Sequence, residues 1–231
     1  MKENFQSSGW LLINKPEGVE SFGVIRRLKF RYSFHKIGFA GTLDPLASGL
    51  LLIGINKATK KIPDIHKEKK SYKLEVRFGA ATSTLDSEGR FLQMKPITHN
   101  IDHRIFHLKN FIGSYQQKIP NYSAHKLNGK NFYELARKNQ IIDDRYKQVS
   151  IYKLKILYSN ISRIGIELDC QTGFYVRAFA EELAKSLGDI AYASRIKRLK
   201  IGAFSLKQAL AYEKILDFSG TNDLHSHLIT I

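Results

Sequence analysis

The sequence predicts an α+β fold, and two kinds of pattern carry that prediction. Stretches in which apolar and polar residues alternate, as they do along a half-buried strand, lie between stretches with the three-to-four-residue apolar spacing of a helix. The chain has 231 residues, 43% of them hydrophobic, so it can bury a sizeable core in one large domain or two small ones. Counting these elements supports the class α+β but leaves the order of the strands open.

The first half of the chain begins with a short apolar strand over 10–14, which the turn formers at 15–18 end. Ser21 is placed to cap a helix that runs to about Phe30, because the apolar residues of that stretch share one face. The other elements expected in this half are a buried strand over 50–55, a helix over 57–65, an alternating strand over 72–78 and a polar loop over 80–90.

The second half contains the clearest strand signal. Alternation over 149–158 and 161–170 predicts an antiparallel hairpin about Ser159 and Asn160, and an amphipathic helix follows over 175–187. The other elements expected are a helix over 101–111, a turn-rich segment over 120–129, a strand over 195–204 and short helices over 131–138 and 206–216. The strand over 195–204 is basic, because Arg195, Lys197 and Lys200 oppose the apolar residues Ile196, Leu199 and Ile201.

The charge balance limits the class of partner. Lysine and arginine outnumber aspartate and glutamate by 37 to 21, which gives a formal net charge of +16. Such an excess fits an RNA or DNA partner, because lysine and arginine neutralise phosphates and release counterions. A generally lysine-rich composition also accounts for it, so charge alone does not decide. A membrane surface fits less well, since no long amphipathic helix has a continuous basic face.

Cysteine content and the chain's start limit the compartment. The single cysteine, Cys170, excludes an internal disulfide and a metal cluster built on cysteines. The first residues lack the apolar core of a signal peptide, and no apolar run approaches the length of a membrane span. We therefore expect a soluble cytoplasmic protein that does not associate with membranes.

The densest chemical signal is the stretch from Gly38 to Gly49, which reads GFAGTLDPLASG. Its three glycines allow positive φ or the close approach of a backbone to a ligand. Pro45 fixes its own φ and favours an extended conformation at Asp44. Asp44 is therefore either a catalytic carboxylate on a stiff loop or a residue that caps a turn, and spacing alone leaves both open.

Five motifs stand in order along the chain: LLINKPEGVES over 11–21, GTLDPLASGLL over 41–51, KSY over 70–72, YSAHKLNG over 122–129 and GFYVR over 173–177. Together they closely resemble the TruB family of tRNA pseudouridine synthases, over roughly residues 9 to 205. The resemblance implies a pseudouridine synthase-like fold, in which a mixed, mainly antiparallel sheet is flanked by helices and carries an inserted thumb.

The reaction that the resemblance implies is the isomerisation of uridine 55 in the T loop of tRNA to pseudouridine, after the target base has flipped out of its stack. Asp44 is then the catalytic residue, which either attacks the ribose at C1′ or abstracts the 2′ proton. Tyr72 is implied to stack on the target base and relay a proton, Arg177 to form an ion pair with Asp44, and Tyr175 to pack beside the flipped base. No cofactor and no metal is implied.

Further residues are implied to support the site or the RNA. Lys15, with Pro16, is expected to support the loop of Asp44 and lie close to the substrate. Phe39 stands where most bacterial members have a histidine, and it could stack on a base instead. Asp86 keeps one position of an acidic pair that the family carries, and it is expected to position the RNA or the loop.

The domain organisation also follows from the resemblance. We expect a catalytic domain over 1–215, with the thumb inserted at about 120–148, and a short tail over 216–231 without the family's usual C-terminal PUA domain. The protein is expected to act as a monomer on the T arm of tRNA. The thumb residues expected to touch the RNA are Tyr122, His125 and Lys126.

Two other functions stay open. One is a pseudouridine synthase of the same fold that acts on a different RNA, because the thumb and the C-terminal module set substrate choice. The other is an RNA-folding factor that binds tRNA without chemistry. The presence of Asp44, Tyr72 and Arg177 argues against the second, since a pure binder has no need for a carboxylate among phosphates.

Overall fold

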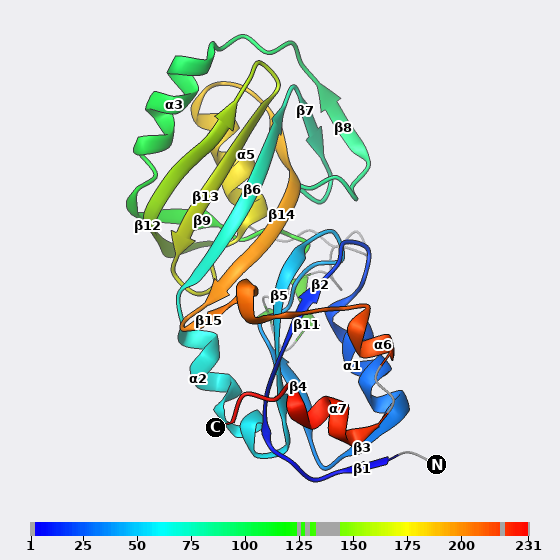
Figure 1. Ribbon diagram of the computed structural model, residues 1–231. Coiled ribbons are helices and arrows are strands. Elements are labelled where there is room, and N and C mark those ends of the chain that lie inside the picture. The colour runs from blue at the N-terminus through cyan, green and yellow to red at the C-terminus, as the bar shows by residue number, and fades with distance from the viewer. Residues whose placement is uncertain (1–2, 124–125, 128–129, 133–143, 218–219, 231) are drawn as a thin grey trace. The chain divides into compact units, whose positions relative to one another are not determined.

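The computed structural model describes residues 3–123, 126–127, 130–132, 144–217 and 220–230 (Figure 1). The chain divides into two compact units. Unit 1 contains the residues up to Tyr72 together with those from Lys197 on, and unit 2 contains Lys73–Ile196. Two strands, β6 (Lys70–Phe78) and β14 (Ala191–Ile201), have residues in both units.

Unit 1 is built on a sheet with the strand order β16-β2-β5-β14, in which β4 also pairs with β5 and β15 with β14. The central pair, β2 and β5, is antiparallel, and β14 runs parallel to β5. The further elements of this unit are β1 (Glu3–Phe5), β2 (Gly9–Lys15), α1 (Ser21–Arg31), β3 (Tyr32–Phe34), β4 (Ile37–Ala40), β5 (Ser48–Ile55), the 3-10 helix η1 (Asn56–Lys61), α2 (Ile62–Lys67), β15 (Phe204–Ser205), the 3-10 helix η2 (Leu206–Gln208), β16 (Leu210–Ala211), α6 (Lys214–Asp217) and α7 (Thr221–Ser226).

The central strands of unit 1 are buried on both faces, which explains why they are apolar without interruption. Leu11 of β2 and Leu51 of β5 face one hydrophobic cluster, which also contains Val24 of α1. Their neighbours Leu12 and Leu52 face a second cluster on the opposite side of the sheet. Successive side chains of a strand point to opposite faces, so both faces here require apolar residues.

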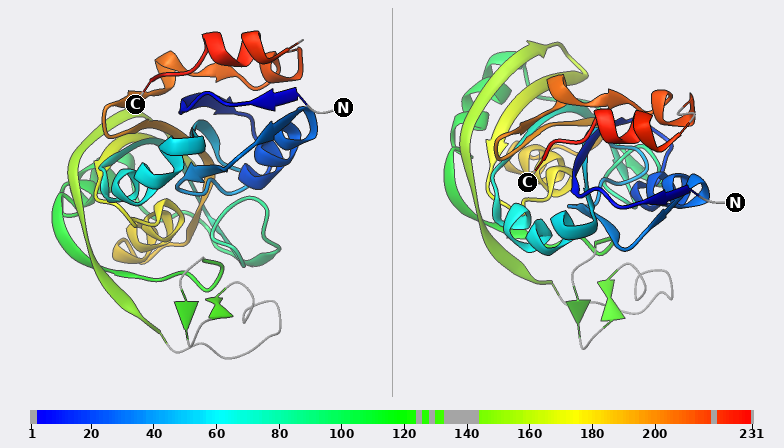
Figure 2. Two further views of the ribbon diagram at one scale, coloured as in Figure 1. Left: turned by 90° about the horizontal axis from the view of Figure 1, so that it is seen from below. Right: turned by 60° about the horizontal axis from the view of Figure 1, so that its bottom comes forward.

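The two ends of the chain meet in unit 1. Figure 2 shows the C-terminal helices beside the N-terminal strands. The backbone of Trp10 exchanges two hydrogen bonds with Ile229, and the Tyr32 hydroxyl donates to the carbonyl of Gly220. The helix predicted over 206–216 is wrong: β16 occurs within that stretch, because Leu210 pairs with Ile13 at the open edge of β2.

Unit 2 has the strand order β14-β6-β13-β12-β9, and β12 is antiparallel to both of its neighbours. Helix α5 lies behind these strands in the view of Figure 1. The hairpin predicted from alternation and the helix predicted after it are both confirmed. The elements of this unit are β7 (Ala80–Thr82), β8 (Phe91–Met94), α3 (Ile101–Lys109), β9 (Gly113–Lys118), β10 (Lys126–Leu127), β11 (Lys130–Asn131), β12 (Tyr146–Ser159), β13 (Arg163–Cys170) and α5 (Val176–Ser186).

Strand β9 is not predicted from the sequence. Its pairing with β12 fixes where the segment that follows it begins and ends. It pairs with β12 from Gly113 opposite Ile151 to Lys118 opposite Tyr146. The next residue, Ile119, donates from its backbone to the carbonyl of Arg145. The chain between them therefore leaves and re-enters the sheet at one place, as an insertion does.

Candidate active site

Asp44 lies on the loop between β4 and β5, residues 41–47, which we call the Asp44 loop. The amide of Ala47 donates to the carbonyl of Asp44 at 3.0 Å, which closes a turn. The flanking side chains of Leu43 and Leu46 are buried, whereas Asp44 is half-buried. The apolar residues thus anchor the loop in the core, while Asp44 keeps part of its surface accessible.

Lys15 and the turn after β2 hold the C-terminal half of this loop. The Lys15 ammonium is fully buried and donates to the carbonyls of Pro45, at 3.2 Å, and Val19, at 2.6 Å. The amide of Gly18 donates to the same Pro45 carbonyl at 2.9 Å. This geometry is that of a support for the Asp44 loop, and contact between Lys15 and a substrate stays a prediction.

Ser21 holds the N-terminal half of the loop. Its hydroxyl donates to the carbonyl of Leu43 at 2.8 Å and accepts from the Leu43 amide at 2.9 Å. The predicted capping role of Ser21 is wrong, because the residue at the N-cap of α1 is Glu20 and no side chain caps the helix there. The serine hydroxyl instead satisfies both polar groups of the residue before Asp44.

Arg198 of β14 makes further contacts with the same loop, although none of the sequence motifs includes it. The side chain is 1% exposed; its Nε donates to the carbonyl of Leu50 at 2.8 Å and its Nη2 to the carbonyl of Gly41 at 2.9 Å. One signal could have found it: Arg198 is two residues from Ile196, so strict alternation places both on the buried face.

Tyr72 and Asp44 share Arg198 as a neighbour. Tyr72 is 9% exposed, and its hydroxyl is a hydrogen-bond partner of the guanidinium. Burial lowers the pKa of Arg198, while the Tyr72 hydroxyl and the Asp44 carboxylate act in the opposite direction. Unit 1 therefore brings together two of the predicted catalytic residues and one arginine that the motifs do not mark.

In unit 2, Arg177 at the start of α5 lies among predicted site residues. Its Nη1 lies 3.3 Å from a carboxylate oxygen of Asp86 and donates to the carbonyl of Thr84 at 2.8 Å. Its Nη2 donates to the carbonyl of Tyr122 at 2.8 Å. Asp86 is 2% exposed and also accepts from the Thr84 hydroxyl and the Glu88 amide. Asp86 thus positions an arginine.

Tyr175 is held through its backbone by Gln117 of β9. The Tyr175 amide donates to Oε1 of Gln117 at 2.7 Å, and Nε2 of Gln117 donates to the Tyr175 carbonyl at 3.2 Å. The Lys147 ammonium lies 4.2 Å from the centre of the Tyr175 ring and donates to the carbonyl of Gly173. Burial lowers the pKa of Lys147. The sequence carries no motif for Gln117 or Lys147.

A second layer supports Gln117. Glu182 of α5 accepts from the amide of Lys118 at 2.9 Å and, at 3.2 Å each, from Nε2 of Gln117 and the hydroxyl of Tyr115. Burial raises the pKa of Glu182, although these hydrogen bonds oppose the rise. Burial and the neighbouring Glu182 raise the pKa of Tyr115. Through Gln117, this network connects Glu182 of α5 to the backbone of Tyr175, the residue before the helix.

A model of the TruB family of pseudouridylate synthases, covering its N-terminal domain, matches residues 27–176. The chain belongs to this TruB family. Its relatives include several tRNA pseudouridine synthases B: that of Ehrlichia ruminantium is 34% identical and aligns over 96% of this chain and 76% of its own length. For the Clostridium kluyveri protein these figures are 35%, 89% and 71%, and for the Ureaplasma urealyticum protein 37%, 94% and 96%.

Solved structures agree on the fold of this TruB-family chain. A chain of a Cbf5-Nop10-Gar1 complex matches with a TM-score of 0.71 at 22% identity, over 91% of this chain and 54% of that one. A chain of an H/ACA RNP bound to a substrate RNA containing 2′-deoxyuridine matches with a TM-score of 0.68 at 20% identity, over 91% and 53%. This chain spans about half their length. The predicted pseudouridine synthase-like fold is confirmed, and the TruB-family chain is an isomerase.

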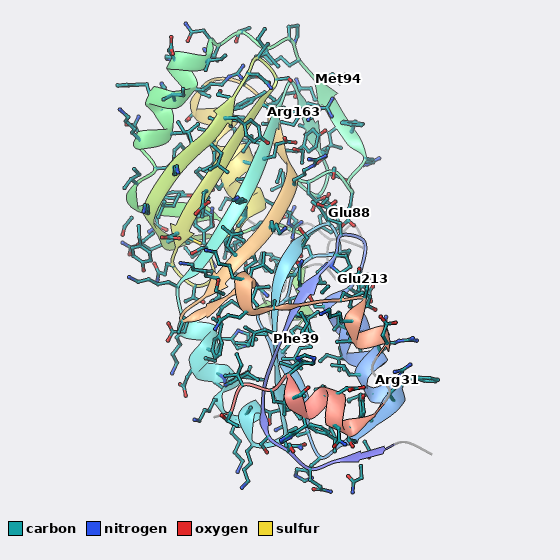
Figure 3. All side chains as sticks on the ribbon, viewed as in Figure 1. Arg31, Phe39, Glu88, Met94, Arg163 and Glu213 are labelled. Atoms are coloured by element: carbon teal, nitrogen blue, oxygen red, sulfur yellow. The ribbon has the colours of Figure 1, made fainter. Side chains whose placement is uncertain are left out.

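The remaining predicted residues of the TruB motifs have different outcomes. Phe39 lies on β4 in unit 1 (Figure 3) and packs, partly buried, against the cluster of Leu11 and Val24, so contact with a base stays a prediction. His125 lies outside the described residues, and only the backbone of Lys126 is described. Pairing of Arg177 with Asp44 joins residues of different units, and it also stays a prediction.

The described part of the TruB-family chain lacks two features. No group of three or more histidine, cysteine, aspartate or glutamate side chains there could hold a metal ion. No helix there is long and apolar enough to cross a membrane.

Proposed function

We propose that this chain converts uridine 55 in the T loop of tRNA to pseudouridine, with Asp44 as the catalytic residue. The relatives named above are tRNA pseudouridine synthases B, and they align over nearly the whole chain. The observation that carries the proposal is the Asp44 loop itself. Buried lysine, serine and arginine side chains bind its backbone at Pro45, Leu43 and Gly41, while Asp44 itself is only half-buried. Such preorganisation suits a catalytic carboxylate.

The proposed reaction needs base flipping, because a side chain cannot reach the glycosidic bond of a stacked base. Asp44 then either attacks C1′ of the ribose or abstracts the 2′ proton, and either step cleaves the bond between N1 and C1′. The freed uracil rotates and forms a new bond from C5 to C1′, which displaces Asp44 from its ester with C1′ in the first route, or is accompanied by return of the proton to C2′ in the second. Finally C5 loses its proton and N1 gains one, so substrate and product are isomers.

We assign the other predicted site residues from the TruB motifs that they match. Tyr72 would stack on the flipped uracil and relay the proton that C5 loses. Tyr175, whose backbone Gln117 fixes, would pack on the base as well. Arg177 would pair with Asp44 and orient it, since a guanidinium fork matches a carboxylate in two hydrogen bonds.

The RNA partner is proposed from charge and from the insertion in unit 2. The net charge of +16 suits a polyanion. The segment between β9 and β12 begins and ends at the adjacent residues Ile119 and Arg145, as an inserted thumb would. We propose that this segment, with Tyr122, His125 and Lys126, contacts the T arm.

The test compares the wild type with Asp44→Asn on an unmodified tRNA transcript. Isomerisation leaves the mass unchanged, so pseudouridine is derivatised with a carbodiimide and mapped by reverse-transcription stops. Tritium released from C5-labelled uridine gives the rate, because C5 loses its hydrogen. We expect a stop at position 55 and a loss of at least about a hundredfold in turnover for Asp44→Asn, with tRNA affinity retained.

The matched control is Asp64→Asn, which removes an exposed carboxylate paired with Lys67 on α2. It should leave turnover unchanged. Stops at another uridine would change the proposed substrate. No modification of any RNA by the wild type, with tRNA still bound, would replace the enzyme by an RNA-folding factor.

A further inference from the structure

We propose that Arg198 is a positioning residue for catalysis, which closes the Asp44 loop at both ends and aligns Asp44 with the Tyr72 hydroxyl. This inference rests on the proposed function, in which Asp44 and Tyr72 contact the target nucleotide. Arg198 itself acts through these two residues. Its role goes beyond that of the motif arginine, Arg177, which belongs to the other unit.

The first argument is where the guanidinium donates. Gly41 is the first residue of the Asp44 loop, and Leu50 lies three residues beyond its end, in β5. One side chain donates to both carbonyls, through Nη2 at 2.9 Å and Nε at 2.8 Å. The two stems of the loop are therefore held together by a single planar group, which fixes the path of the residues between them.

The second argument is the backbone at the two glycines that flank the loop. Gly41 has φ of +74° and Gly49 has φ of +101°, values that favour glycine. A Cβ at Gly49 would lie 2.3 Å from the carbonyl oxygen of Arg198, and one at Gly41 would lie 3.2 Å from Nη1 of the same arginine. Both glycines therefore admit the close approach of Arg198, from its backbone on one side and its side chain on the other.

The third argument is chemical. The nearest buried residues on either side of Arg198 in β14, Ile196 and Ile201, are apolar, and an apolar residue at 198 would avoid the penalty for burying a cation. An arginine suits this place only if its donors and its charge are used. Two donors hold carbonyls, a third partner is the Tyr72 hydroxyl, and the Asp44 carboxylate lies within electrostatic range. Lysine offers no planar fork and replaces arginine incompletely.

These contacts predict a loss in turnover and little change in RNA affinity. Arg198 is 1% exposed, so it has almost no surface to offer to a phosphate. Loosening the Asp44 loop misplaces the carboxylate, and a misplacement of about 1 Å can lower a rate by about a hundredfold. We therefore expect kcat to fall by roughly ten- to a hundredfold in Arg198→Met, with KM within about threefold of the wild type.

The experiment measures single-turnover and steady-state pseudouridine formation in Arg198→Met, Arg198→Lys, Tyr72→Phe and the double variant Arg198→Met with Tyr72→Phe. Because Arg198 acts partly through the Tyr72 hydroxyl, removing that hydroxyl should cost less in the Arg198→Met background than in the wild type. Arg198→Lys should retain part of kcat. The control is Arg195→Met, an exposed arginine three residues away on the same strand.

Two further readouts distinguish a positioning role of Arg198 from a purely structural one. Rates are divided by the fraction of folded protein, taken from thermal unfolding and from the stoichiometry of tRNA binding. Arg198→Ala is also assayed with millimolar ethylguanidine, which should restore part of kcat if a guanidinium is what the site lacks. That variant keeps the test valid if Arg198→Met does not fold.

Each outcome decides one claim. Three results would each overturn the positioning role. They are an unchanged kcat per folded molecule in Arg198→Met, additive effects of Arg198→Met and Tyr72→Phe, and equal losses in kcat and tRNA affinity. Failure of the wild type to form pseudouridine at all would overturn the proposed function instead. The inference is supported if kcat falls in Arg198→Met, if this effect is not additive with that of Tyr72→Phe, and if ethylguanidine restores part of kcat in Arg198→Ala.

Discussion

Arg198 in unit 1 and Arg177 in unit 2 are both buried, and they use their donors differently. Arg198, 1% exposed, donates to two backbone carbonyls at the ends of one loop. Arg177, 9% exposed, also donates to two carbonyls, but it pairs in addition with the buried carboxylate of Asp86. The comparison indicates that unit 1 fixes the shape of a loop, whereas unit 2 fixes the placement of a charge.

The largest effect that would test this comparison is steric, at Gly49. Gly49→Ala places a Cβ 2.3 Å from the Arg198 carbonyl oxygen and imposes a φ of +101° on a residue with a side chain. Left-handed strain of about 1–2 kcal/mol and overpacking of about 1–3 kcal/mol add to a loss of roughly 2–5 kcal/mol in the free energy of unfolding. Urea unfolding monitored by fluorescence of Trp10 measures it.

Gly18→Ala is the matched control for that substitution. Gly18 has a similar φ of +79°, but a Cβ there meets no atom within 4 Å. The loss in the free energy of unfolding for Gly18→Ala should be limited to the left-handed strain, about 1–2 kcal/mol. Equal losses at Gly18 and Gly49 would show that the close approach of Arg198 contributes nothing to the stability of the loop.

The next effect concerns the ion pair of unit 2. Asp86→Asn keeps the shape of the side chain and its hydrogen-bonding oxygen but removes the charge that faces Arg177. Hydrogen bonds to charged groups contribute about 1.5–3 kcal/mol, so we expect a loss of about 2 kcal/mol in unfolding free energy. Turnover should fall as well, because the guanidinium of Arg177 is no longer held on that side.

The control for Asp86→Asn is again Asp64→Asn, whose partner Lys67 is exposed. Surface pairs contribute about 0–1 kcal/mol, so this change should be nearly neutral. If both substitutions are neutral, the Arg177–Asp86 pair does not stabilise unit 2, and the contrast between the two arginines rests on geometry alone.

Local patterns in the sequence predicted much of the fold. The hairpin of β12 and β13 and the helix α5 follow from periodicity within each segment, which needs no knowledge of the rest of the chain. The failures share another cause. The local pattern favours a helix over 206–216, but Leu210 pairs with Ile13, almost two hundred positions earlier, and no local pattern indicates such a partner.

The candidate site was predicted in the same uneven way. Motifs marked Arg177 and Asp86, yet nothing in the sequence indicated that they bind each other across 91 positions. Arg198 and Gln117 carry no motif, because their roles depend on backbone groups of distant residues such as Gly41 and Tyr175. A buried polar side chain is recognised by its partners, and the partners are fixed only by the fold.

The smallest expected effect is a pH dependence confined to unit 2. Burial raises the pKa of Glu182, so the native protein binds that proton more tightly than the unfolded chain does. The free energy of unfolding should therefore fall as pH rises from the unfolded pKa, about 4.3, through the raised native value, and then stay constant. The slope is at most about 1.4 kcal/mol per pH unit, the limit for one proton.

Glu75, in the same unit, should act in a separate pH window. Burial alone raises the pKa of Glu75, but hydrogen bonds from Tyr158 and Ser194 and the charge of Arg163 outweigh it and leave the pKa lowered. Its stabilisation is present above the unfolded pKa and is lost as pH falls through the lower native value. The two carboxylates are therefore distinguishable. Glu182 makes the free energy of unfolding depend on pH above about pH 4.3, and Glu75 does so below it.

Glu182→Gln isolates the first of them. Urea unfolding at several pH values between 4.5 and 7 should give a flatter dependence in this variant than in the wild type, whereas the exposed Glu213→Gln (Figure 3) should keep the wild-type slope. Glutamine supplies one accepting oxygen where Glu182 supplies two, so the acceptor is lost either by the Lys118 amide, which donates to Oε1, or by Tyr115 and Gln117, which both donate to Oε2. A less firmly held Gln117 would release the backbone of Tyr175.

If turnover falls in Glu182→Gln while the dependence of unfolding free energy on pH flattens, the carboxylate of unit 2 serves the site by positioning Tyr175. An unchanged slope would mean that Glu182 keeps its charge without a penalty, and that unit 2, like unit 1, is held by geometry alone.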